Sequence, residues 1–358
     1  MVRVSPVSPQ PPLPRSRTAA ALLLSVALLA SCGGANGAEP TAKPSPSASP
    51  SASPSPSPLA PKPAPKAVSP FTGKPPLSTG DVVAMKIDNS PLARPYHRGL
   101  NEAALMYQEM MEGGATRFLA VYSPATGNEV GPLRSIREGD IELMQQFGKL
   151  ALGASGGNTG VLATLAQAEK NGLMLDVSFD TIPGPYRKGE RRKDAINFFT
   201  SPEKIAKTKP SGTKPRDIGL RFGPLPAGAG FPAPKASVRF SPISVVSVTY
   251  DKAGGRYAVF QDGDRMKDYA PTNIVVQHVQ IRNTRYVDVL GNRTPYTNTV
   301  GEGPVAVLRD GRRLSGTWRR MAPHTGTRFL DDKGRDLPLR PGPTLVLLVP
   351  SGMPLSVG

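Results

Sequence analysis

Short apolar segments separated by polar or glycine-rich turns predict the first part of the fold. The run Val82–Ile87 is rich in β-forming residues and predicts a buried strand that ends in a turn at 88–91. Residues 105–111 and 116–123 alternate around Gly113-Gly114 and predict a β-hairpin. A helix over 101–111 is the alternative, but the paired glycines and the β-branched and aromatic second arm favour the hairpin.

The next stretch predicts helices that alternate with strands. Ser135 and Glu138 have the spacing of a capping box, which predicts a helix from Ser135 to about Phe147. Residues 150–154 predict a buried strand, and a Ser-Gly-Gly-Asn loop then leads into a helix over 159–171. Strand, glycine-rich loop and helix in this order resemble a generic anion-binding turn, but neither GxxxxGK[ST] nor GxGxxG is present.

The pattern changes after residue 206. Residues 201–205 predict the start of a short helix, and the Pro/Gly/Lys-rich segment 207–236 predicts an internal boundary. Beyond it, no helical pattern of useful length occurs, and a series of strands is predicted between turns. These strands are Ser244–Tyr250, Gly255–Gln261, Ile274–Ile281, Tyr286–Leu290, Val305–Leu308, Gly316–Arg319 and Thr344–Val349. The predicted fold class is α+β, with a mixed α/β-layer domain followed by a mainly antiparallel β domain.

The N-terminal segment predicts export and lipid attachment. Residues 1–31 combine arginines, an apolar core too short to span a bilayer, and small residues, as in a signal peptide. Leu29-Ala30-Ser31-Cys32 resembles a bacterial lipobox, which predicts lipidation of Cys32; the alternative is an ordinary signal peptide with an incidental cysteine. Cys32 is the single cysteine of the sequence, so no disulfide forms within it. No later stretch approaches the roughly 20 apolar residues of a membrane span.

A stalk then separates the anchor from the folded part. Residues 32–70 are rich in Pro, Ser and Ala and predict a disordered linker. About thirty such residues in polyproline II conformation reach on the order of 90 Å. The expected organisation is therefore a signal peptide (1–31), a linker (32–70), an N-terminal α+β domain (71–206), an interdomain linker (207–236) and a C-terminal β domain (237–358).

Charge is distributed unevenly, and this bears on partners. The net charge is +17, yet residues 81–160 carry seven Lys/Arg against nine Asp/Glu, whereas residues from 161 onward carry thirty against seventeen. In the cytoplasm such a basic excess would suggest nucleic acid. After export, wall polymers and anionic lipid headgroups are the polyanions at hand, so nucleic acid is not the favoured partner.

Residues 82–140 contain the densest set of candidate site residues. The carboxylates Asp88, Glu102, Glu109 and Glu112 are of the type that performs acid-base chemistry or binds a divalent ion. The alternative is that they neutralise nearby arginines in a structural network, since buried charges are normally paired. Scattered histidines argue against a softer metal centre, and neither HExxH nor GxSxG is present. No metal and no cofactor are expected.

Two arginines at the predicted helix start form the most specific proposal. Arg134 and Arg137 would lie beside free helix N–H groups, where forked guanidinium bonds suit a carboxylate or phosphate. Arg117 and Asn101 would complete this ligand site. The basic cluster at 187–193 would contact anionic polymer or lipid, or be a solvated loop. Trp318 and Tyr286 would stack on sugars, although packing in the core or on a sheet face is favoured.

Motifs spread over nearly everything after the stalk resemble the YerB-type family of bacterial lipoproteins, known as a domain of unknown function (DUF3048). The residues that carry the resemblance are Lys86-Ile87-Asp88-Asn89, Ala93-Arg94-Pro95, Gly99-Leu100, Glu112-Gly113-Gly114, Thr116-Arg117-Phe118, Gly131-Pro132, Arg134-Ser135, Arg137, Asn197, Thr200-Ser201, Asn273 to Gln277, Gly316-Thr317-Trp318, Arg328-Phe329 and Pro341-Gly342. The resemblance implies a lipid-anchored protein with an α+β part and a β-rich part, and no established reaction. Ile196, Ala104 and Gln108 depart from the family's usual His, Asp and Glu.

Three hypotheses follow. The leading one is a cell-envelope lipoprotein that binds an anionic wall component or a wall-synthesis protein through Arg134, Arg137, Arg117 and Asn101. The alternative is a hydrolase that acts on wall polymer, with Asp88, Glu109 or Glu112 as its catalytic candidates. Exposed carboxylates about 5–9 Å apart across a cleft would favour hydrolysis, and carboxylates buried against arginines would favour binding or a structural role. A structural adaptor would instead expose an apolar patch on the β domain.

Overall fold

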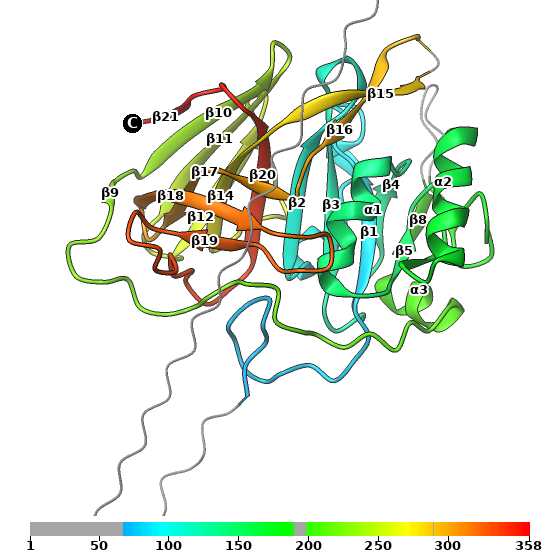
Figure 1. Ribbon diagram of the computed structural model, residues 1–358, viewed down its shortest axis with the longest axis horizontal. Helices are drawn as coiled ribbons and strands as arrows, with labels where there is room; N and C mark the ends of the chain where they lie inside the picture. Colours follow the sequence, from blue (N-terminus) through cyan, green and yellow to red (C-terminus); the bar gives the residue numbers. More distant parts are fainter. Residues whose placement is uncertain (1–66, 190–197, 289) are drawn as a thin grey trace, which may run out of the picture. The chain divides into compact units, whose positions relative to one another are not determined.

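One large mixed sheet contains strands from both ends of the folded chain (Figure 1). The computed structural model describes residues 67–189, 198–288 and 290–358, all within the compact unit Pro63–Gly358. The predicted signal peptide, Cys32 and most of the linker lie outside the described residues, as do Ile196, Asn197 and the second half of the basic cluster.

The large sheet has 14 strands. They are β1 (Val83–Asp88), β2 (Leu105–Met110), β3 (Thr116–Tyr122), β4 (Val130–Leu133), β5 (Leu150–Gly153), β6 (Met174–Asp176), β7 (Arg187–Lys188), β8 (Phe198–Thr200), β9 (Phe231–Pro232), β14 (Asn273–Val279), β17 (Gly301–Arg309), β18 (Arg312–Arg320), β19 (Arg328–Leu330) and β20 (Thr344–Pro350). Their order is β19-β18-β17-β14-β20-β2-β3-β1-β4-β8-β7; β5 branches from β1, β6 pairs with β5, and β9 pairs with β18.

Strand β20 joins the two halves of the chain. Its sequence is almost wholly apolar and six of its seven residues are buried, as expected for a strand covered on both faces. It pairs in parallel with β14 on one side and with β2 on the other. The prediction of mainly antiparallel pairing in the second half therefore holds for its hairpins. It does not hold for β20, because this strand inserts between β14 and β2 and runs parallel to both.

A smaller antiparallel sheet packs beside the large one. It contains β10 (Lys235–Ser241), β11 (Ser244–Asp251), β12 (Arg256–Gln261), β13 (Asp264–Arg265) and β21 (Leu355–Val357). A separate hairpin is formed by β15 (Ile281–Val287) and β16 (Arg293–Thr297). The predicted strand at 286–290 is placed too late, because the Asp288 carboxylate accepts backbone hydrogen bonds from Leu290 and Asn292 and closes a turn there.

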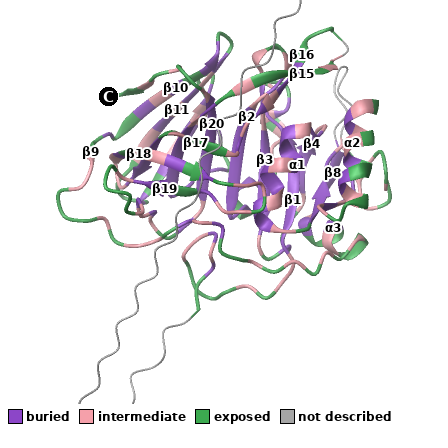
Figure 2. Ribbon diagram, viewed as in Figure 1, coloured by how far each residue is buried: buried purple, intermediate pink, exposed green. Residues whose placement is uncertain are grey.

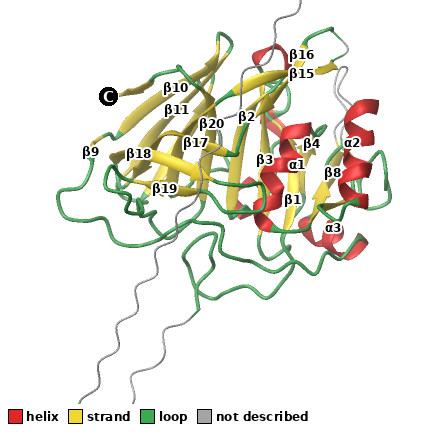
Figure 3. Cartoon of the chain, in the orientation of Figure 1, coloured by secondary structure: helices red, strands yellow, loops and turns green. Residues whose placement is uncertain are grey.

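Helices belong to the first half of the described chain (Figure 3). They are α1 (Glu138–Met144), α2 (Thr159–Lys170), α3 (Pro202–Thr208) and the 3-10 turns η1 (Arg94–Tyr96), η2 (Leu100–Glu102), η3 (Glu112–Gly114) and η4 (Gln145–Phe147). The protein is thus mostly β with few helices, in broad agreement with an α+β class. The strand interiors are buried on both faces of the large sheet, and the helices keep an exposed side (Figure 2).

Two local predictions have clear outcomes. The hairpin of β2 and β3 is confirmed by its antiparallel register, and Gly113 and Gly114 adopt the positive φ angles of 66° and 82° that its turn requires. The capping box at Ser135 is wrong. Ser135 forms a bridge to Gly156, which keeps the backbone extended, so α1 begins only at Glu138, and Asp140 accepts the N-cap hydrogen bond from the backbone of Arg137.

Candidate functional site

Alternation along three neighbouring strands places charged side chains on one face of the large sheet. Lys86 and Asp88 of β1, Glu109 of β2 and Arg117 of β3 share this face, and Arg117 lies opposite both Asp88 and Glu109 in register. Four further residues reach the same region from η3 and the β4–α1 segment. They are Glu112, Arg134, Arg137 and Asp140. We call these eight residues, four cations and four carboxylates, the charge network.

A buried lysine lies at the centre of the charge network. Lys86 is fully buried, and its Nζ pairs with Glu109 and, at 2.8 Å, with Asp140 of α1. Both carboxylates are also buried. Burial lowers the pKa of Lys86 to about 8, although Asp140 acts in the opposite direction. The Asp140–Lys86 ion pair holds α1 against the sheet, and removing Lys86 would leave two buried carboxylates without their cation.

Arg137 and Glu112 form a second buried pair. The Nε and Nη2 of Arg137 donate to the two carboxylate oxygens of Glu112 at 2.6 and 2.8 Å, a forked arrangement. Thr294 of β16 donates to the same carboxylate at 2.6 Å, so the hairpin from the second half covers this pair. Burial alone would raise the pKa of Glu112, but the hydrogen bonds from Arg137 hold it below its ordinary value.

Arg134 and Arg117 form the outward side of the charge network. The Nε of Arg134 lies 3.0 Å from the Asp88 carboxylate, and the Arg134 side chain is 30% exposed whereas that of Asp88 is 5% exposed. Arg117 is partly exposed and donates to the carbonyl of Ser135 at 3.0 Å. Burial and the nearby Arg137 lower the pKa of Arg117 to about 9, so it stays charged at neutral pH. The accessible groups of the network are therefore cations.

Other sequence-predicted residues lie elsewhere. Asn101 is exposed in η2, and its side chain accepts a hydrogen bond from the backbone of Ala270. No hydrogen bond or ion pair within the described ranges joins it to the arginines of the charge network. Glu102 binds Asn128, and Arg94 pairs with Asp262 of the smaller sheet. Ala104 and Gln108 are both buried.

One member of the charge network escaped the sequence analysis as a site residue. Lys86 pairs with Asp140 although 54 positions separate them, and only Asp140 was counted in the charge-rich stretch 82–140. Alternation within β1 offered a signal, because Lys86 lies two residues before Asp88 and therefore on the same face. A lysine inside an apolar strand is itself informative, since a buried lysine requires a partner.

The aromatic candidates pack against protein. Trp318 is 2% exposed, and its Nε1 donates to the carbonyl of His278 at 2.7 Å. Tyr286 is partly buried, and its hydroxyl lies 3.3 Å from that of Thr164 on α2. Arg187, from the described part of the basic cluster, pairs with Glu129.

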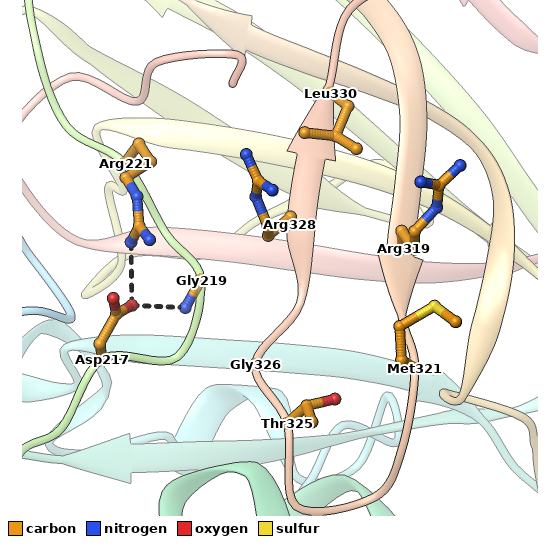
Figure 4. Close-up of a pocket in the computed structure, with 9 residues that line it drawn as sticks. All are labelled: Asp217, Gly219, Arg221, Arg319, Met321, Thr325, Gly326, Arg328 and Leu330. Carbon is orange, nitrogen blue, oxygen red and sulfur yellow. Dashed lines mark hydrogen bonds and ion pairs between the residues drawn. The ribbon is translucent and has the colours of Figure 1, made fainter. Parts of the chain in front are cut away.

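An open pocket of about 410 Å³ in the second half gathers three arginines (Figure 4). Arg221 pairs with Asp217, Arg328 with Asp336 and Arg319 with Glu302. Because each guanidinium has a carboxylate partner, the pocket presents little uncompensated charge.

Within residues 67–189, 198–288 and 290–358, no group of three or more His, Cys, Asp or Glu side chains is arranged to hold a metal. In the same ranges, no helix has the length and apolar character needed to cross a membrane.

The fold and the charge network together define the class of this protein. It is a mostly β protein in which both halves of the chain contribute strands to one large sheet, and buried ion pairs lie on one face of that sheet. Residues 71–214 match the DUF3048 N-terminal domain and residues 236–346 the DUF3048 C-terminal domain, both described as of unknown function. The chain belongs to this family, as its motifs indicated. It is 27% identical over 279 residues to "Putative lipoprotein YerB" of Bacillus subtilis, covering 75% of this chain and 81% of that protein. The crystal structure of YerB from Bacillus subtilis is similar in fold, with a TM-score of 0.67 at 22% identity, covering 81% of this chain and all of the other.

Proposed function

We propose that this protein is a lipid-anchored protein on the extracytoplasmic face of the bacterial cell membrane. It binds an anionic cell-wall component or an acidic surface of a wall-synthesis protein. The anchor is the lipid on Cys32, and the segment 32–70 is the stalk. The lipobox pattern supports this anchoring, and the Bacillus subtilis relative is itself named "Putative lipoprotein YerB".

The observation that carries the proposed binding is the orientation of the charge network. Its four carboxylates have side chains that are at most 5% exposed, as the ion pairs and burial of Asp88, Glu109, Glu112 and Asp140 show. The Arg134 side chain is 30% exposed and Arg117 is partly exposed, whereas Arg137 is buried. A neutral network whose carboxylates are buried and whose Arg134 side chain reaches solvent attracts anions, because nearby charges dominate the local potential.

The hydrolase alternative receives less support from the same geometry. Glu109 pairs with Lys86 and Glu112 with Arg137, so these carboxylates are not free to exchange protons with a substrate. Asp88 is 5% exposed and faces Arg134. A general acid or base must reach the proton that it transfers, and buried, ion-paired carboxylates do not.

Adaptor function through a single apolar surface also receives little support. The exposed large apolar side chains in the described part of the second half are spread over five places in the fold. Phe231 lies in β9, Ile243 in the β10–β11 turn, Val287 and Leu290 in the β15–β16 hairpin, Met321 after β18 and Val357 in β21.

The test is cosedimentation of the full chain, purified in nonionic detergent, with isolated cell wall at matched salt. Arg134→Ala removes an accessible cation and should weaken binding, with a loss of only about 1 kcal/mol in the free energy of unfolding, so the variant stays folded. Arg335→Ala is the matched control, because this arginine is 71% exposed and pairs with Asp331 in a turn of the second half. Equal binding by both variants would remove the charge network from the proposed site. Arg137 is unsuitable for this test, because its loss breaks a buried pair.

A further inference from the structure

A second pocket lies where the first half of the chain meets the smaller sheet. Its volume is about 370 Å³, within the range of small-molecule sites. Arg94, His97 and Leu100 line it from the segment between β1 and β2, and Arg265, Met266 and Lys267 line it from the segment after β12. It shares none of its lining residues with the charge network.

Buried groups make the inner wall of this pocket rigid. Leu100 and Met266 are 1% and 7% exposed and supply an apolar base. Arg94 donates to the carbonyls of Asn89 and Gln261, both at 3.2 Å, and pairs with Asp262. A guanidinium fixed by three acceptors loses little further freedom when a ligand binds, which favours affinity.

His97 presents a defined hydrogen-bond acceptor. Its Nε2 lies 2.7 Å from the carbonyl oxygen of Asp88. A carbonyl only accepts, so Nε2 carries the proton and Nδ1 holds the lone pair. Within the described residues, no donor pairs with Nδ1. Burial lowers the pKa of His97, which keeps the imidazole neutral at pH 7 although Asp88 and Asp268 act in the opposite direction.

Charges of both signs lie unpaired at the mouth. Arg265, Lys267 and Asp268 are exposed, and none of the three forms an ion pair or side-chain hydrogen bond within the described ranges. A fourth charged residue, Asp264, lies 3.5 Å from Arg94 and is 74% exposed, so this contact is weak. Two unpaired cations next to the unpaired carboxylate of Asp268 complement a ligand that carries both charges.

We propose that this pocket binds a short zwitterionic peptide, such as a dipeptide with a free ammonium group and a free carboxylate. Arg265 and Lys267 bind its carboxylate, Asp268 binds its ammonium group, and His97 Nδ1 accepts a hydrogen bond from its amide N–H. This site goes beyond the anion binding proposed for the charge network and is independent of it, because the two use different residues.

The experiment follows the imidazole signals by NMR in the full chain, labelled with ¹⁵N and purified in detergent. The sequence has only three histidines, His97, His278 and His324, so their signals are readily separated, and His97→Gln assigns the first. The probes are alanyl-alanine, its N-acetyl form and its C-terminal amide, up to tens of millimolar. Alanyl-alanine should shift the Nδ1 signal of His97 saturably, and each blocked form should bind about tenfold more weakly, because it lacks one charge.

Variants separate this proposal from its rivals. Arg265→Ala/Lys267→Ala should weaken alanyl-alanine binding by about tenfold or more without unfolding, because both side chains are exposed and unpaired. Lys252→Ala, at an exposed lysine of the β11–β12 turn, is the matched control and should bind normally, as should Arg134→Ala. A His97 signal that never moves, or that moves equally in the double variant, would overturn the proposal. So would an Nδ1–H tautomer in the free protein.

Discussion

Replacing Arg137 by methionine tests whether the charge network holds the two halves of the chain together. Arg137 makes two hydrogen bonds to Glu112, at 2.6 and 2.8 Å, and a third to the carbonyl of Ile136 at 2.8 Å. In Arg137→Met, the buried Glu112 carboxylate would keep only the Thr294 hydroxyl as a side-chain partner. Removing one partner of a buried ion pair costs about 3–5 kcal/mol, so we expect a loss of that size in the free energy of unfolding.

The assay is urea unfolding followed by circular dichroism at pH 7, with the midpoint and slope fitted separately. Arg134→Met is the comparison, since this side chain is 30% exposed and has a single carboxylate contact at 3.0 Å; we expect a loss of about 1 kcal/mol. Adding Glu112→Gln to Arg137→Met should recover stability, with a coupling energy of about 2 kcal/mol. A loss below about 1 kcal/mol for Arg137→Met, no larger than that of Arg134→Met, would refute this account of the network.

The same pair predicts acid sensitivity. Arg137 keeps the pKa of Glu112 below its ordinary value, even though burial opposes this. The pair therefore adds stability above about pH 4.3, the unfolded pKa of a glutamate, and this contribution is lost as the pH falls through the folded pKa. Arg137→Met should lose less stability over that acid range than the parent chain.

Three further predictions concern other parts of the fold. The pKa of Lys86 is lowered to about 8 from 10.5, so between these values the unfolded chain binds more protons than the folded chain. The free energy of unfolding should therefore rise by about 2 kcal/mol from pH 7 to pH 9.5 through this group. Lys86→Met should abolish the rise. Gly316→Ala should lower the free energy of unfolding by about 1–3 kcal/mol, because the added Cβ would lie 1.9 Å from the backbone oxygen of Leu330. In Gly223→Ala the added Cβ meets no atom within 4 Å, so this control should have little effect in the same thermal melts. A double-mutant cycle on Arg319 and Glu302, which are 50% and 62% exposed, should give a coupling below about 1 kcal/mol; a larger value would mean that this surface pair is rigidly held.

Local pattern was enough to find most elements. Alternation around Gly113-Gly114 identified the β2–β3 hairpin, because only a period of two buries one face of each arm. The helix α2 begins and ends within one residue of its prediction, since Asn158 caps its start and Gly172, at a φ of 72°, follows its end. The capping box at Ser135 failed because a long-range bridge to Gly156 outweighs the local preference.

Part of the candidate site was equally accessible to pattern reasoning. Residue type and density pointed to Asp88, Arg117 and the carboxylates near them, because charges inside apolar strands require partners. Sequence spacing does not say which partner each charge takes. Asp140 reaches Lys86 only because α1 packs on the sheet, and Thr294 reaches Glu112 only because the β15–β16 hairpin crosses from the second half.

The sequence by itself determined the strands, the main turns, the family and the presence of a charge-rich region, since these depend on residue type and on periods of two or 3.6. Tertiary structure decided which carboxylates are buried, which guanidinium side chains are exposed and where β20 inserts into the large sheet. Strand β20 lies between β2 and β14 because an apolar strand is most stable with both faces covered, and neither neighbour is close to it in sequence. Pairings of this kind depend on the burial of the whole sheet, which no local pattern encodes.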